Sequence, residues 1–132
     1  MADIIGSINA RAAAAVTQHK LVKLAASVAA DGLPDAEHGA AGTDLCVGVS
    51  KQTYADNDVM EIQVVGVVTL VAGETLTLGT NHALCSGAAG VAMACTANDK
   101  QVATFLGSLK GSATAASGDL ILAVLGAAHY EG

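Results

Sequence analysis

The sequence predicts a mainly β protein: a small β-barrel, β-tulip or sandwich with an extended N-terminal arm. The stretch from Val59 to Gly79 is the longest run rich in Val, Ile, Thr and Leu, and it contains no proline. Short apolar segments recur roughly every ten residues between turn-forming residues, a spacing typical of barrels and sandwiches. The length of 132 residues fits one domain. We expect residues 1–18 to form the arm and residues 19–132 a single barrel-like domain.

The first 43 residues carry conflicting signals. Ser7 could cap a helix that continues through the alanine run Ala12 to Ala15, because alanine has the highest helix propensity. In contrast, the β-branched pair Val16-Thr17 and the segment His19 to Leu24 favour a strand. We therefore expect an extended arm or one short helix through Ala15, and then a strand near residues 19–26.

Turn-forming residues divide the rest of the chain. Asp31 to Asp35 contains Gly32 and Pro34 and predicts a turn, and a Gly- and Ala-rich loop is expected to follow it over residues 36–43. Val59 to Gly79 is expected to be the central hairpin of the barrel, with a bulge or close backbone approach at Gly66 and a turn at Gly73-Glu74. The remaining strands are expected at residues 44–50, 81–86, 90–96, 101–109 and 119–125.

Composition argues against several classes of protein. The net charge is −6 and the six basic residues are scattered, whereas nucleic-acid binding requires clustered Lys and Arg. No apolar run is long enough to span a membrane, and the first residues do not resemble a secretory signal. Aromatic residues make up 2% of the chain, so the core is thin and benefits from partner subunits. Three cysteines are an odd number for a disulfide framework, so we expect small buried thiols in a reducing compartment, at Cys46, Cys85 and Cys95.

Candidate chemical groups do not form a recognisable catalytic or metal-binding motif. His82 precedes Cys85 by three residues, but no second close pair of ligands accompanies them. Glu37-His38 is interpreted as a solvated surface pair, and the acidic tip Asp56 to Asp58 lacks the spacing of a calcium loop. The sequence therefore predicts a protein that is not an enzyme and that uses no metal and no cofactor.

A set of short motifs resembles a known family. Residues 11–18 followed by Leu21 to Leu24 are similar to the opening of small tailed-phage head proteins of the capsid decoration, or cement, type. Gly48-Val49-Ser50, the segment Ala72 to Gly79 and the closing segment Gly118 to Leu125 are similar to later strands of that family. The long loop from residue 32 to residue 43 departs from the family pattern, as does the absence of a basic residue in the last four positions.

The resemblance implies a structural virion protein made in the host cytoplasm. Such a protein binds as a homotrimer to the major capsid protein on the outer surface of an icosahedral phage head, where it stabilises contacts between capsid subunits. Its arm would contact the capsid through Ile4, Ile5 and Ile8, with Arg11 as a charge contact. An alternative is a small β-barrel binding module that displays its loops to a carbohydrate or host surface, and a third hypothesis is a small hydrolase.

Overall fold

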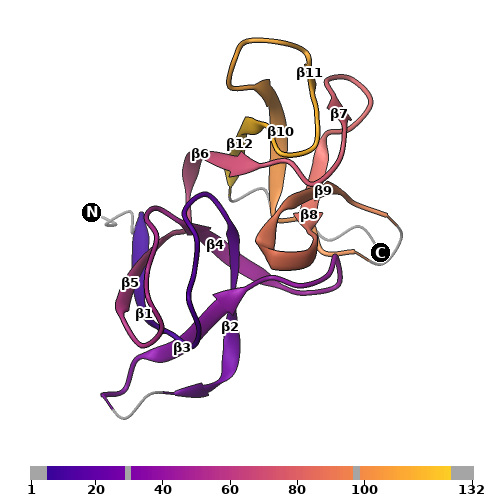
Figure 1. Cartoon of the computed structure of the whole chain (residues 1–132). Helices are drawn as coiled ribbons and strands as arrows, with labels where there is room; N and C mark the ends of the chain where they lie inside the picture. The colour runs from indigo at the N-terminus through magenta and orange to yellow at the C-terminus, as the bar shows by residue number, and fades with distance from the viewer. Residues whose placement is uncertain (1–5, 29–30, 97–98, 126–132) are drawn as a thin grey trace, which may run out of the picture.

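Five strands from the first half of the chain close into a barrel (Figure 1). The computed structural model describes residues 6–28, 31–96 and 99–125. The barrel strands follow the order β1-β3-β2-β4-β5 around the closed sheet. Their bounds are β1 Ser7–Ala12, β2 Leu21–Val28, β3 Pro34–His38, β4 Cys46–Ser50 and β5 Val59–Gln63.

The barrel interior is narrow, and the sequence matches it with small side chains. A barrel's diameter grows with its number of strands, and about eight are needed before the interior comfortably holds large side chains. The alanines Ala10, Ala12 and Ala36 are almost completely buried inside this five-stranded barrel. They pack with the other fully buried members of this core, Val16, Val22, Met60 and Ile62.

The second half of the chain forms a five-stranded sheet of order β6-β12-β10-β8-β9. All pairs in this sheet are antiparallel, and a single parallel bridge joins Ala72 after β6 to Ala92 of β9. A separate two-stranded sheet pairs β11 with β7. The bounds are β6 Gly66–Val71, β7 Leu76–Thr77, β8 Ala83–Ser86, the 3-10 turn η1 Ala88–Gly90, β9 Ala92–Ala94, β10 Ala103–Ser108, β11 Thr114–Ala115 and β12 Leu120–Leu125.

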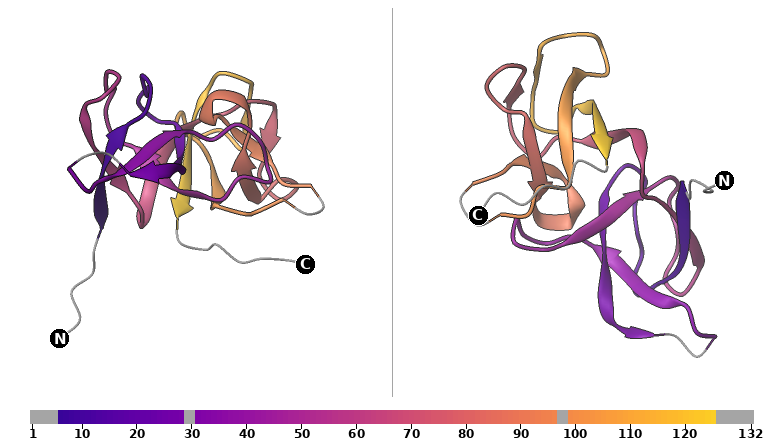
Figure 2. Two further views of the ribbon diagram at one scale, coloured as in Figure 1. Left: turned by 90° about the horizontal axis from the view of Figure 1, so that it is seen from below. Right: turned by 180° about the vertical axis from the view of Figure 1, so that it is seen from behind.

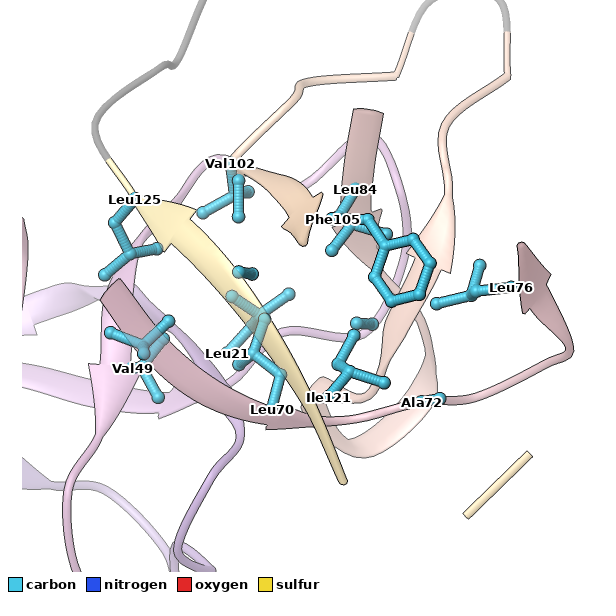
Figure 3. Packing of buried hydrophobic residues seen from close by; sticks show 14 of the residues in the cluster. Leu21, Val49, Leu70, Ala72, Leu76, Leu84, Val102, Phe105, Ile121 and Leu125 are labelled. Atoms are coloured by element: carbon cyan, nitrogen blue, oxygen red, sulfur yellow. The ribbon is translucent and has the colours of Figure 1, made fainter. Parts of the chain in front are cut away.

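The barrel and the sheet lie side by side and share a hydrophobic core (Figure 2). Leu21 and Val49 project from the barrel strands β2 and β4 toward Leu70 and Ile121 of the sheet (Figure 3). Gly90 permits a close approach between the halves, because a Cβ at this position would lie 2.6 Å from the carbonyl oxygen of Leu21. The positive φ of Gly90, 75°, also favours glycine.

The predicted mainly β class is confirmed, and the strands expected near residues 44–50, 81–86, 90–96, 101–109 and 119–125 are present. The interpretation of Val59 to Gly79 as one central hairpin is wrong. β5 belongs to the barrel, β6 pairs with β12, and β7 pairs with β11. Gly66, with φ of 100°, therefore marks the point where the chain leaves the barrel and enters the sheet.

Two further expectations for the first half of the chain are corrected. The segment Ser7–Ala12 is a strand, so the short-helix alternative there is wrong; pairing with β3 and β5 satisfies its backbone and overrides the helix propensity of alanine. The expected loop after Pro34 contains β3, whose first residue is proline, a position that strands tolerate. Residues 1–5, the beginning of the expected arm, lie outside the described residues.

The expectation for the cysteines is also wrong in part. Cys85 of β8 and Cys95, directly after β9, form a disulfide with a Cα–Cα distance of 5.2 Å. The prediction that all three are free thiols is therefore wrong for this pair. Cys46 is free and buried, as expected.

Candidate interaction surface

The predicted contact residues on β1 are engaged within the barrel. Ile8 is half-buried and packs against the barrel core. The Nη1 group of Arg11 donates a hydrogen bond to the carbonyl oxygen of Asn57 at 2.9 Å, and its Nη2 group forms an ion pair with Asp31. The hydrogen bond from Arg11 is the main cause that lowers the pKa of the Asp31 carboxyl below its usual value. Arg11 thus ties β1 to the β2–β3 turn and to the loop before β5.

The described chain begins and ends at the same place in the fold. Gly6 accepts a hydrogen bond through its carbonyl oxygen from the N–H of Val64, at 3.0 Å. Leu125, the last residue of β12, pairs with Gly66 at the start of β6. The segment 64–66 therefore lies beside both ends of the described chain, and Ile4 and Ile5, which precede Gly6 in the sequence, lie outside the described residues.

The groups considered for chemistry have structural partners. Cys85, considered with His82 as a half-site for a metal, is oxidised to the disulfide. Nε2 of His38 accepts a hydrogen bond from the N–H of Thr17 at 3.0 Å. The Asp58 carboxylate accepts the N–H of Ala55 at 2.9 Å and so closes the loop at the acidic tip. Among the residues that the structure describes, no group of three or more His, Cys, Asp or Glu side chains could hold a metal ion.

Two further features bear on reactivity and on membrane contact. Burial is the main cause that raises the pKa of the Cys46 thiol to about 11, so the thiol is protonated and unreactive near neutral pH. Within the described ranges, no helix has the length and apolar character needed to cross a membrane.

An open groove of about 620 Å³ lies on the barrel surface beside β2 and β4. Its charged wall is organised around Asp44, which accepts the N–H groups of Ala40 and Ala41 at 2.8 and 3.1 Å. The Nζ of Lys23 lies 3.2 Å from Asp44 and 3.8 Å from Glu37. The backbone hydrogen bond from Ala40 is the main cause that lowers the pKa of Asp44, and the bond to Asp44 raises the pKa of Lys23. These charges are paired within the chain, so they hold the loop between β3 and β4 against the barrel.

A buried hydroxyl fixes the connection between β1 and β2. Ser50 is completely buried, and its Oγ donates to the carbonyl oxygen of Thr17 at 2.6 Å and accepts the N–H of Lys20 at 3.2 Å. Between these residues His19 has a positive φ of 66°, and its carbonyl oxygen accepts the N–H of Val71 at 3.2 Å. This tight turn therefore links the barrel directly to β6 of the sheet.

The architecture is a closed barrel joined to an antiparallel sheet, and this fold is similar to that of a protein from a phage head. A solved structure described as the head fiber gp8.5 N base in bacteriophage phi29 is similar to this chain with a TM-score of 0.71. The similarity covers 96% of this chain and 98% of the other, at 19% sequence identity, which shows a shared fold. No protein-family model and no curated protein sequence matches this chain. The fold thus agrees with the resemblance to phage head proteins drawn from the sequence motifs.

Proposed function

We propose that this protein is a structural virion protein of a bacteriophage, specifically a capsid decoration protein on the outer surface of an icosahedral head. The observation that supports the proposal most directly is the similarity to the head fiber base, which extends over nearly the whole of both chains. In this role the protein binds the major capsid protein, stabilises contacts between capsid subunits, and performs no chemistry.

The position of Gly6 and Leu125 beside residues 64–66 suggests which end of the molecule faces the shell. Ile4 and Ile5 directly precede Gly6, whose carbonyl oxygen is bonded to Val64. Val65, next to the hydrogen bond between Gly6 and Val64, is 38% exposed. We propose that the end formed by residues 64–66 faces the capsid, with Ile4 and Ile5 as apolar anchors. Ile8 and Arg11 would then support the contact from β1, where they keep the strand and its neighbouring turns in place.

Each copy needs to bind only weakly for the shell to gain stability. A homotrimer presents three N-terminal segments at once, and the second and third contacts form at a high effective concentration. The gain in avidity can reach roughly 10²–10⁴ without any new type of contact. A homotrimer is therefore part of the proposal.

The bounds of β1 determine which deletion can test this proposal. Removing residues 1–10 would also remove most of β1 from the closed barrel, whereas removing residues 1–5 leaves β1 complete. We expect the 1–5 deletion, and the double variant Ile4→Ser/Ile5→Ser, to bind heads of the encoding phage at least tenfold more weakly than the intact chain in co-sedimentation. Heads assembled without this protein are the binding partner.

Leu109→Ser is the matched control, because Leu109 is 47% exposed and lies near Leu120, at the other end of β12. This variant should bind heads as well as the intact chain. Unchanged binding by the 1–5 deletion would exclude the N-terminal anchors, and failure of the intact chain to co-sediment with heads would exclude the decoration role. Binding to host cells or polysaccharide instead would favour a module that displays its loops.

A further inference from the structure

The strands β6, β12 and β10 expose an apolar face on the side away from the core. Along each strand alternate residues are buried in the core, and the residues between them face outward. The outward residues include six aliphatic side chains: Val67, Val71, Leu106, Leu120, Leu122 and Val124. We call these residues, with Thr69 and Thr104 between them, the outer face.

This outer face is unusual for an antiparallel sheet. When such a sheet covers a core on one side, its other side is normally polar. Here the outer face carries no charged residue, and Val67, Leu106 and Leu120 are 58%, 44% and 36% exposed. The apolar surface continues past β10, because Leu78 lies against the backbone of Gly107, where an added Cβ would be 3.4 Å from its Cδ1 atom.

The pairing register of β6, β12 and β10 places these side chains next to one another. Val124 pairs with Val67 on one side and with Thr104 on the other, so the three lie in one row across the strands. Leu122 pairs with Thr69 and with Gly107, and Leu120 pairs with Val71. A bulge between Phe105 and Gly107 leaves Leu106 as an additional exposed apolar residue in β10. The result is one continuous patch.

We infer that this outer face is where copies of the chain associate with one another. The inference rests on the proposed function, in which the protein is a homotrimer, and it assigns the surface that holds the copies together. Patches of this kind on soluble proteins mark interaction sites, and the buried centres of interfaces between identical subunits are apolar and poor in charge. A standard interface buries roughly 800 Å² on each partner, so the outer face supplies its centre and the neighbouring residues supply its rim.

Charge directs a contact between copies of the chain to the outer face. The chain carries a net charge of −6, so most of its surface repels another copy. The barrel exposes many of the acidic side chains, among them Glu37, Asp56, Asp58 and Glu61. The outer face allows two copies to meet without bringing carboxylates together. At its β6 border a small groove carries Lys51, Gln63 and His19, which provides the polar rim typical of an interface.

The geometry is also compatible with a contact to the shell. The outer face runs along the six residues of β12, from Leu120 to the end at Leu125 and Gly66 that we place against the capsid. Copies that meet through this face would stand side by side with the same end toward the shell. Three copies can therefore turn the outer face toward a common axis and still contact the capsid together.

The test compares lysine substitutions that differ only in location. Val67→Lys and Leu106→Lys place charges on the outer face, and Leu45→Lys is the control, because Leu45 is 62% exposed and lies on the barrel side of the molecule. In sedimentation equilibrium we expect the intact chain and Leu45→Lys to associate equally. We expect each outer-face variant to lower the association constant at least tenfold, and the double variant to be monomeric.

Thermal unfolding of the variants verifies that they remain folded. As a second measurement, Thr69→Cys should form a disulfide-linked dimer under mild oxidation, and Ser117→Cys, at an exposed turn outside the face, should not. A monomeric intact chain, undiminished association of the double variant, or an equal effect of Leu45→Lys would overturn the inference. Failure of the intact chain to co-sediment with heads, with self-association intact, would exclude the decoration role and leave this inference standing, so the two proposals fail separately.

Discussion

Leu21 and Val22 are consecutive residues of β2, yet their side chains lie in different hydrophobic cores. Successive side chains of a strand point to opposite faces, so one strand can serve as a wall between two cores. Leu21 packs with the sheet and Val22 packs inside the barrel, and both are completely buried. β2 therefore couples the stability of the barrel to that of the sheet.

Alanine substitutions at these two positions should destabilise the whole molecule. We expect Leu21→Ala to lower the free energy of unfolding by about 3 kcal/mol and Val22→Ala by about 2 kcal/mol, because each leaves a cavity. Both variants should unfold in one cooperative transition. Denaturation followed by circular dichroism, together with hydrogen exchange of the β1 and β12 amides, measures the effect.

Val28→Ala in the same strand is the control, since Val28 is 66% exposed, and it should change stability by less than about 0.5 kcal/mol. If Val22→Ala increased exchange in β1 and left β12 fully protected, the two halves would be independent and the coupling through β2 would be refuted.

The disulfide between Cys85 and Cys95 should contribute measurably to stability. Replacing both residues by serine removes a crosslink that closes a short loop, which is worth roughly 2–3 kcal/mol on the chain-entropy account. We expect Tm to fall by about 10 °C. The Cys46→Ala variant, which keeps the crosslink, provides the comparison under reducing and non-reducing conditions.

Thiol titration provides an independent check. Of the three cysteines, two are in the disulfide, so unfolded and unreduced protein should show one reactive thiol, that of Cys46. Three reactive thiols in oxidised preparations would contradict the assignment.

His38 should make stability depend on pH below neutrality. Burial, with a smaller effect of the Lys20 charge, lowers the pKa of His38 below its ordinary value of 6.5. The unfolded chain then binds its proton at a higher pH than the folded chain. The stabilisation is complete above about pH 6.5 and decreases as the pH falls through that value toward the lower pKa of the folded state.

The neutral ring is also the form that accepts the N–H of Thr17 at Nε2. In His38→Gln the loss of stability between pH 7.5 and 5.5, measured by denaturant unfolding, should be clearly smaller than in the unmodified chain. The carboxyl groups of Asp31 and Asp44, whose pKa values are lowered, titrate below this window and do not interfere. An identical pH dependence in both proteins would assign the effect to another group.

Local sequence is sufficient to predict short apolar strands that lie between turns. β10 and β12 are predictable because each belongs to a short, largely apolar run that turn residues flank. β3 was missed because four of its five residues are only half-buried, and Ala36 is its single buried side chain. β1 was ambiguous because Ala10 and Ala12 suit a helix by propensity but here fill a narrow barrel.

Strand partners were harder to predict than strands. Val59 to Gly79 looked like a hairpin because its two runs are adjacent, yet β6 pairs with β12, about fifty positions later in the sequence. Pairing over that distance depends on how whole faces pack, which a local pattern does not contain. The disulfide was missed for a similar reason, since two strands must first pair before Cys85 and Cys95 come within reach.

The candidate contact residues were also predictable only in part. The apolar character of Ile4, Ile5 and Ile8 was visible in the sequence, but the engagement of Arg11 by Asp31 and Asn57 was not, because these partners lie in loops far along the chain. The outer face did leave a signal. The closing strand, Leu120 to Leu125, is aliphatic at every position, whereas an antiparallel strand with one solvated face normally alternates apolar and polar residues.

Gly6 and Leu125 both lie beside residues 64–66, so the two ends of the molecule along β12 differ. This difference matters if the protein is used as a scaffold to display a foreign peptide. The turn from Leu109 to Ser112 is at the opposite end of β12, roughly 17 Å away at the usual rise of an antiparallel strand. In the orientation that we propose, with the Gly66 end against the shell, this turn points outward. A foreign peptide inserted between Lys110 and Gly111 would then be presented to the surroundings, at the end of β12 opposite to the segment 64–66.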